Sequence, residues 1–121
     1  MALTCLIVDD SKEFLAAAAR LFAPSSLQVV GLASTGADAK RLVAALAPDV
    51  VLLDVELGDE DGIELARELT SGGSRPRVIL ISLRDRGELA ELIAGSGAVG
   101  FLRKDALGAP AVADLVGGSA R

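Results

Sequence analysis

An apolar run near the start of the chain, Leu6-Ile7-Val8, ends in two adjacent carboxylates and a serine, Asp9-Asp10-Ser11. Later apolar runs end in a similar way: Asp54 follows residues 50–53, Ser82 follows residues 78–81, and Lys104 comes shortly after Phe101-Leu102. Short apolar runs of this kind are typical of buried strands. Because the carboxyl ends of parallel strands meet at one edge of a sheet, we expect one shared pocket for Asp9, Asp10, Asp54, Ser82 and Lys104.

Three carboxylates, a hydroxyl and an ammonium group in one pocket indicate a metal-dependent site that accepts a phosphoryl group. Taken alone, each residue has a simpler interpretation, as a turn former, a helix cap or a surface lysine. The adjacent pair Asp9 and Asp10 argues for a cation-binding role beyond these simpler ones. Neighbouring carboxylates repel and only one is needed to cap a helix, so a cation would normally neutralise them. Asp54 ends an aliphatic strand, where an ionised acid is costly unless it is solvated or paired.

Segments with helical periodicity alternate with the apolar runs along the chain. The predicted strands occupy residues 3–8, 27–32, 50–53, 78–81 and 98–102. A predicted helix follows each strand: Ser11 caps the first helix, Pro48 stops the second, and the last starts near Pro110. Strict alternation with continuous apolar strands predicts an α/β fold, in which helices cover both faces of a parallel sheet.

Composition limits the function of the chain. Its 121 residues, 51% of them hydrophobic, predict one domain with a substantial core. The net charge of −5 and the absence of Trp and Tyr argue against direct nucleic-acid binding by this domain. No apolar run is long enough for a membrane span and the first residues do not resemble a signal peptide, so we expect a cytoplasmic location and no membrane partner. Cys5 is expected to be a small buried hydrophobe.

The joint arrangement resembles the response-regulator receiver family, the CheY-like domains of two-component signalling. The resemblance covers nearly the whole chain and rests on residues 6–11, 54–62, 81–82 and 97–105. It implies a flavodoxin-like, doubly wound sheet of five parallel strands in the order 2-1-3-4-5. It also implies a signalling domain rather than an enzyme, with a receiver domain at 1–117 and a tail or the start of a linker at 118–121.

The resemblance also implies a role for each polar residue. Asp54 would be the phosphoacceptor and would attack the phosphohistidine of a sensor histidine kinase or a phosphotransfer protein. Mg²⁺ would be held by Asp10, Asp54 and the backbone carbonyl of Glu56, with Asp9 reached directly or through water. Lys104 would brace the phosphoryl oxygens, so that no separate general base is needed.

Signal output is expected to start from Ser82 and Phe101. In such a receiver the Ser82 hydroxyl would donate a hydrogen bond to the phosphoryl group and draw its loop inward. Phe101, three positions before the lysine, would turn inward with it, although a plain core position is an equal alternative. The face formed by the fourth helix, fifth strand and fifth helix would then contact a downstream protein, a fused output domain or a second copy in a phosphorylation-dependent homodimer.

Several residues depart from the usual pattern of this family, among them Phe101, which lacks the hydroxyl of the frequent tyrosine. Leu83 stands where a small residue is common and is predicted to narrow access to Asp54, which would slow small phosphodonors and prolong the phosphorylated state. Glu56 adds negative charge at the mouth of the pocket. Gly58 replaces a common proline and Glu60 a common apolar residue, which predicts a more mobile and more acidic loop after Asp54.

Several alternatives remain open. Residues 100–105 are similar to receivers that precede a helix-turn-helix domain in transcriptional regulators, so a stand-alone receiver and a fragment of a DNA-binding regulator are both plausible, as is a phosphorylation-independent interaction module. A haloacid dehalogenase phosphatase fits poorly, because Asp54-Val55-Glu56 follows the third strand and lacks the second aspartate. A dinucleotide site would need glycines where Asp9 and Asp10 stand.

Overall fold

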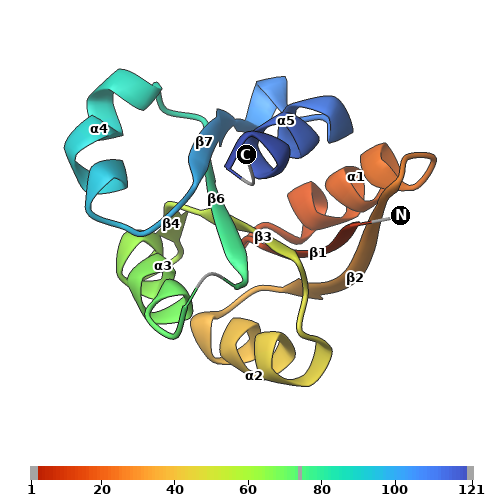
Figure 1. Cartoon of the computed structure of the whole chain (residues 1–121), viewed down its shortest axis with the longest axis horizontal. Coiled ribbons are helices and arrows are strands. Elements are labelled where there is room, and N and C mark those ends of the chain that lie inside the picture. Colours follow the sequence, from red (N-terminus) through yellow and green to blue (C-terminus); the bar gives the residue numbers. More distant parts are fainter. Residues whose placement is uncertain (1–2, 74, 120–121) are drawn as a thin grey trace.

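The long strands form one parallel sheet with helices on both sides in the computed structural model, which describes residues 3–73 and 75–119 (Figure 1). The strands of this sheet are β1 (Leu3–Val8), β2 (Leu27–Ala33), β3 (Val50–Asp54), β6 (Arg77–Ser82) and β7 (Gly100–Arg103). Their spatial order is β2-β1-β3-β6-β7, and each pairing is parallel. Counted by long strands alone, this is the order 2-1-3-4-5, so the predicted doubly wound α/β fold is confirmed.

The helices divide between the two faces of the sheet. They are α1 (Lys12–Phe22), α2 (Gly36–Leu46), α3 (Gly62–Thr70), α4 (Arg86–Ala94) and α5 (Ala109–Ser119). Helices α1 and α5 pack on one face, and α2, α3 and α4 cover the other (Figure 1). Within the described residues, no helix has the length and apolar character needed to cross a membrane.

Strand β3 shows why the apolar runs are continuous. Val50 and Leu52 belong to the core cluster beneath α1 and α5, whereas Val51 and Leu53 belong to the cluster on the opposite face. All four side chains are fully buried. A strand that is covered on both sides cannot alternate apolar with polar residues, and this requirement produces the run that ends at Asp54.

The predicted helix boundaries agree well with the structure. The Ser11 side chain accepts a hydrogen bond from the backbone N–H of Phe14 at 3.2 Å and so caps α1, as predicted. Helix α2 ends two residues before Pro48, and α5 begins one residue before Pro110. Cys5 is fully buried, as expected, and burial raises the pKa of its thiol to about 12.

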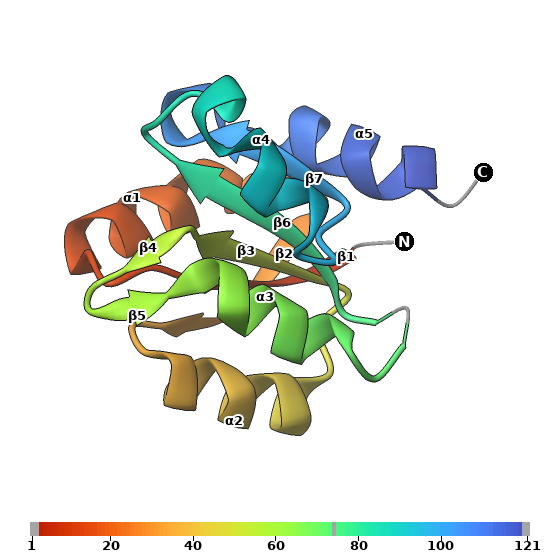
Figure 2. The ribbon, with the colours of Figure 1, turned by 90° about the vertical axis from the view of Figure 1, so that its left-hand side faces the viewer.

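The structure also contains elements that the sequence did not predict. A short antiparallel hairpin, β4 (Glu56–Leu57) and β5 (Glu60–Asp61), follows β3 and lies near the starts of α2 and α3 (Figure 2). A 3-10 turn, η1 (Lys104–Ala106), follows β7, which starts at Gly100 rather than at Ala98. Residues 118 and 119 continue α5, whereas 120 and 121 lie outside the described residues, so the domain boundary after 117 stays a prediction.

Candidate functional site

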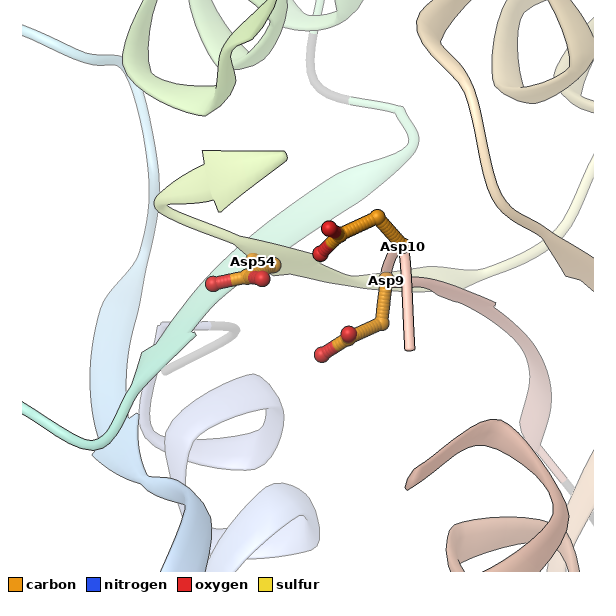
Figure 3. A group of neighbouring side chains, drawn as sticks. All are labelled: Asp9, Asp10 and Asp54. Atoms are coloured by element: carbon orange, nitrogen blue, oxygen red, sulfur yellow. The ribbon is translucent and has the colours of Figure 1, made fainter. Parts of the chain in front are cut away.

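Three carboxylates converge at the carboxyl edge of the sheet, where Asp9 and Asp10 follow β1 and Asp54 ends β3 (Figure 3). One oxygen from each of the three lies within 4.8 Å of the others. This follows from the pairing of β1 with β3, in which Val8 lies opposite Leu53. Asp9 is fully buried and Asp54 is 5% exposed, whereas Asp10 is exposed.

Backbone hydrogen bonds fix the two buried carboxylates. The N–H of Asp9 donates to the carbonyl of Ala33 at 3.0 Å, which extends the pairing of β1 with β2 by one residue. The N–H of Ser11 then donates to Asp9 Oδ1 at 2.9 Å, and the N–H of Glu56 donates to Asp54 Oδ1 at 3.2 Å. Each buried acid therefore has one oxygen held by the backbone and the other turned toward the pocket.

Lys104 supplies a positive charge in this pocket. It is the first residue of η1, and its Nζ lies 2.6 Å from Asp9 Oδ2 and 3.4 Å from Asp54 Oδ2. Burial by itself would lower the pKa of Lys104, but the carboxylates of Asp9 and Asp54 hold that pKa above its ordinary value. Lys104 therefore stays protonated at neutral pH and bridges the two buried acids.

The charge on Asp54 is costly at this buried position. Burial, and then the negative charge of Asp9, raise the pKa of Asp54 to about 6, while Lys104 and the backbone N–H of Glu56 act in the opposite direction. The carboxylate is thus mostly ionised at neutral pH but is poorly compensated. A buried acid with a raised pKa beside a specific charged partner is typical of a functional site.

The acidic cluster fits a divalent cation. Three carboxylates against one ammonium group leave two uncompensated negative charges near pH 7. In the described part of the chain, Asp9 Oδ2 is buried without a hydrogen bond, although Lys104 Nζ forms an ion pair with it. Carboxylate oxygens are hard ligands, and both Mg²⁺ and Ca²⁺ prefer such ligands.

Ser82 lies at the same edge of the sheet as the acids. It is the last residue of β6, where Ile81 lies opposite Asp54, and only 3% of Ser82 is exposed. Its Oγ accepts a hydrogen bond from the backbone N–H of Arg84 at 3.0 Å and so holds the turn into α4. The next residue, Leu83, is 65% exposed and contributes little to the core.

Phe101 lies in the core. It is 8% exposed and belongs to the same apolar cluster as Leu89 and Ile93 of α4. The core position that the sequence suggested is therefore present. A role of Phe101 in switching stays a prediction.

The hairpin after β3 passes close to Asp10 and is tied to the start of α2. Gly58 adopts a left-handed conformation with φ of 61° in the β4–β5 turn, and a Cβ at this position would lie 3.6 Å from Asp10 Oδ2. Both carboxylate oxygens of Glu60 lie 3.1 Å from the N–H of Gly36, at the start of α2. The loop that follows the phosphoacceptor candidate is thus tied to a neighbouring helix.

Sequence reasoning did not predict the contacts that Phe14, Glu60 and Arg84 make around the site. Phe14 belongs to the apolar stripe of α1, yet its ring lies against Lys104. Glu60 bonds a residue 24 positions away, for which no local pattern exists. Arg84 forms exposed ion pairs with Glu56 at 3.8 Å and with Glu88 at 3.5 Å, at the mouth of the pocket.

Comparison with known protein families identifies one match. The response regulator receiver domain matches residues 5–111. A protein-glutamate methylesterase/protein-glutamine glutaminase of Cereibacter sphaeroides is 42% identical over 106 residues, which are 86% of this chain and 29% of that protein. The chain therefore spans less than a third of this relative's length.

Solved structures show the same similarity. The signal receiver domain of the putative response regulator NarL from Mycobacterium tuberculosis superposes with a TM-score of 0.85 at 35% identity, covering 97% of this chain and 98% of the other. The BeF3-activated N-terminal receiver domain of RstA from Klebsiella pneumoniae gives a TM-score of 0.79 at 28% identity, covering 93% and 94%. Both likenesses extend over nearly the whole chain.

Proposed function

Because the chain belongs to the response regulator receiver family, we propose that Asp54 is the phosphoacceptor of a two-component signalling pathway. The observation that carries this proposal is the contact of Lys104 Nζ with Asp54 Oδ2 at 3.4 Å, inside a cluster of three carboxylates. Asp9 is also bonded to the backbone that follows it, but it is fully buried and lies closer to Lys104, whereas Asp54 is 5% exposed and is the buried acid that a donor could reach. The chain is the receiver domain of a response regulator, and its chemistry would be its own phosphorylation and dephosphorylation.

Mg²⁺ is the cofactor that we propose for the acidic cluster. Asp10 and Asp54 would hold it, together with the backbone carbonyl of Glu56, and Asp9 would contribute directly or through water. Mg²⁺ prefers an octahedral shell of oxygens that keeps several waters, which suits a half-exposed group of carboxylates. When bound, the ion would neutralise charge on the phosphoryl oxygens.

Phosphoryl transfer itself needs no proton acceptor on this chain. An ionised Asp54 oxygen would attack the phosphorus of a phosphohistidine, and the P–N bond would break with its electron pair leaving on the imidazole of the donor, which takes up a proton. A P–O bond then joins the phosphoryl group to Asp54 as an acyl phosphate. Lys104, already held as an ammonium group, would face the charge that develops on the phosphoryl oxygens.

Ser82 would report the phosphorylated state. Its oxygen accepts a hydrogen bond from Arg84, which leaves the hydroxyl proton to be donated to a phosphoryl oxygen. Movement of Ser82 would shift the start of α4 and free space next to Phe101, which is buried in the structure. The surface of α4, β7 and α5 would then change shape and contact the output partner.

The partner that supplies the phosphoryl group would be a histidine kinase or a phosphotransfer protein. The partner that receives the signal would be a downstream protein or a fused output module. The relatives described above include a methylesterase and response regulators, so an enzymatic output and a regulatory output are both compatible with this receiver. The acidic composition favours protein contacts in the cytoplasm, and any DNA contact would come from another module.

Intact-mass measurement after incubation with Mg²⁺ and acetyl phosphate, or with a phosphorylated kinase, tests the proposal. One added phosphoryl group is expected in the wild type and none in Asp54→Asn. Asp59→Asn, on the exposed hairpin turn, is the matched control and should still be phosphorylated. A wild type that accepts no phosphoryl group from any donor would favour a phosphorylation-independent interaction module.

A further inference from the structure

The aromatic ring of Phe14 lies against the active-site ammonium group. Lys104 Nζ is over this ring, 4.7 Å from its centroid, in the distance range of a cation–π interaction. Phe14 is half-buried in the first turn of α1, far in sequence from Lys104. The ammonium group therefore lies against two carboxylates and one aromatic face.

The contacts around Lys104 connect four residues in a ring, namely Ser11, Phe14, Lys104 and Asp9. The N–H of Ser11 donates to Asp9 Oδ1, and the Ser11 hydroxyl accepts from the N–H of Phe14. The Phe14 ring faces Lys104, and Lys104 pairs with Asp9 Oδ2. The residue that caps α1 thus fixes both the acid and the ring that flank the same ammonium group.

We propose that Phe14 is a positioning residue, whose ring face holds the Lys104 ammonium group against Asp54 and thereby sets the rate at which Asp54 accepts a phosphoryl group. This inference rests on the proposed role of Asp54. The ring face attracts the ammonium charge and accepts at most a weak N–H···π contact, so the ammonium group keeps protons for the two carboxylates. An ammonium group that is already positioned need not move when negative charge develops on the phosphoryl oxygens, so no free energy is spent on reorganising the site.

A purely structural role for Phe14 predicts something different. Its ring also packs against the core cluster beneath α1, as does the fully buried Phe22 in the last turn of the same helix. Leucine at position 14 would keep most of that apolar packing but remove the aromatic face. The two roles are therefore separable by substitution.

The experiment measures phosphorylation rate against acetyl phosphate concentration, with saturating Mg²⁺, for the wild type, Phe14→Leu, Phe14→Tyr and Phe22→Leu. Phe14→Leu should lower the maximal phosphorylation rate about three- to ten-fold. The acetyl phosphate concentration that gives half of this rate should change little, because the proposed role of the ring is to position Lys104 and not to bind the donor. Phe14→Tyr keeps the ring face and should stay near the wild-type rate. Phe22→Leu is the matched control, because it also removes an aromatic ring from α1, and its phosphorylation rate should stay near that of the wild type.

A second readout is independent of phosphorylation. In NMR spectra of the wild type, the Lys104 Hε protons should be shifted upfield by the ring current of Phe14, and this shift should vanish in Phe14→Leu and persist in Phe14→Tyr. Equal rates for Phe14→Leu and wild type, or equal slowing by Phe14→Leu and Phe22→Leu, would overturn the proposal. If the wild type accepted no phosphoryl group, the proposed function and the rate effect would both fail, whereas the Hε shift would still show whether the ring contact exists.

Discussion

Replacing Asp54 by asparagine is expected to stabilise the metal-free protein, and to stabilise it more as the pH rises. The pKa of Asp54 is raised from 3.8 to about 6 in the folded state, chiefly by burial. Between these two values the folded state binds more protons than the unfolded state, so the free energy of unfolding falls as the pH rises through this window. Asparagine has no ionisable group, so the Asp54→Asn protein does not bear the cost of a buried charge at this position.

The size of the effect follows from the pKa difference. Linkage between the pKa of 3.8 in the unfolded state and about 6 in the folded state gives a cost of about 1 kcal/mol near pH 4.5 and about 3 kcal/mol near pH 8. Asp54→Asn should recover most of this cost, so its free energy of unfolding should exceed that of the wild type by about these amounts.

Urea unfolding in the presence of a chelator, for both proteins across this pH range, measures the difference. Saturating Mg²⁺ should narrow the gap at high pH, because an ion that binds the folded wild type stabilises it by mass action. Asp59→Asn is the control and should change stability by less than about 0.5 kcal/mol at each pH. A stability difference between Asp54→Asn and wild type that does not vary with pH would refute the reasoning.

Three further predictions concern neighbouring residues. Lys104→Met should lower the free energy of unfolding by about 3 kcal/mol in denaturant titrations, because it leaves the buried Asp9 unpaired; no loss would mean that the ion pair is not formed. Glu60→Gln should destabilise the protein by about 1 kcal/mol in thermal unfolding, since a charge-assisted hydrogen bond to the start of α2 becomes neutral; equal melting temperatures would contradict this. Leu83→Ala should alter stability by less than about 0.5 kcal/mol, because Leu83 is 65% exposed, yet speed phosphorylation by acetyl phosphate and shorten the phosphorylated state; equal rates would remove the proposed effect on access.

The architecture was predictable because burial on both sides leaves a strong trace in sequence. β3 reads as Val50-Val51-Leu52-Leu53, and its successive side chains enter two different core clusters. The β4–β5 hairpin was not predictable in the same way. Each of its strands has two residues and they are held by Gly58 and by the distant contact of Glu60 with Gly36, so neither periodicity nor composition reveals them.

The candidate site was partly readable for a related reason. Strand ends are local features, and parallel pairing brings Asp9, Asp10 and Asp54 together once the strands are recognised. The contact of Phe14 with Lys104 depends on how α1 is oriented over the sheet, which the helical stripe alone does not fix. Raised or lowered pKa values are likewise products of three-dimensional burial, as with Asp54.

The most direct test of the phosphoacceptor assignment is to locate the phosphoryl group on the chain. After incubation with Mg²⁺ and acetyl phosphate, borohydride reduction converts an aspartyl phosphate to homoserine, and peptide mass spectrometry identifies the modified position. The account predicts homoserine at Asp54 and at no other carboxylate, with none when the donor is omitted. Homoserine at Asp9 or Asp10 instead, or at Asp10 in the Asp54→Asn protein at wild-type yield, would contradict it.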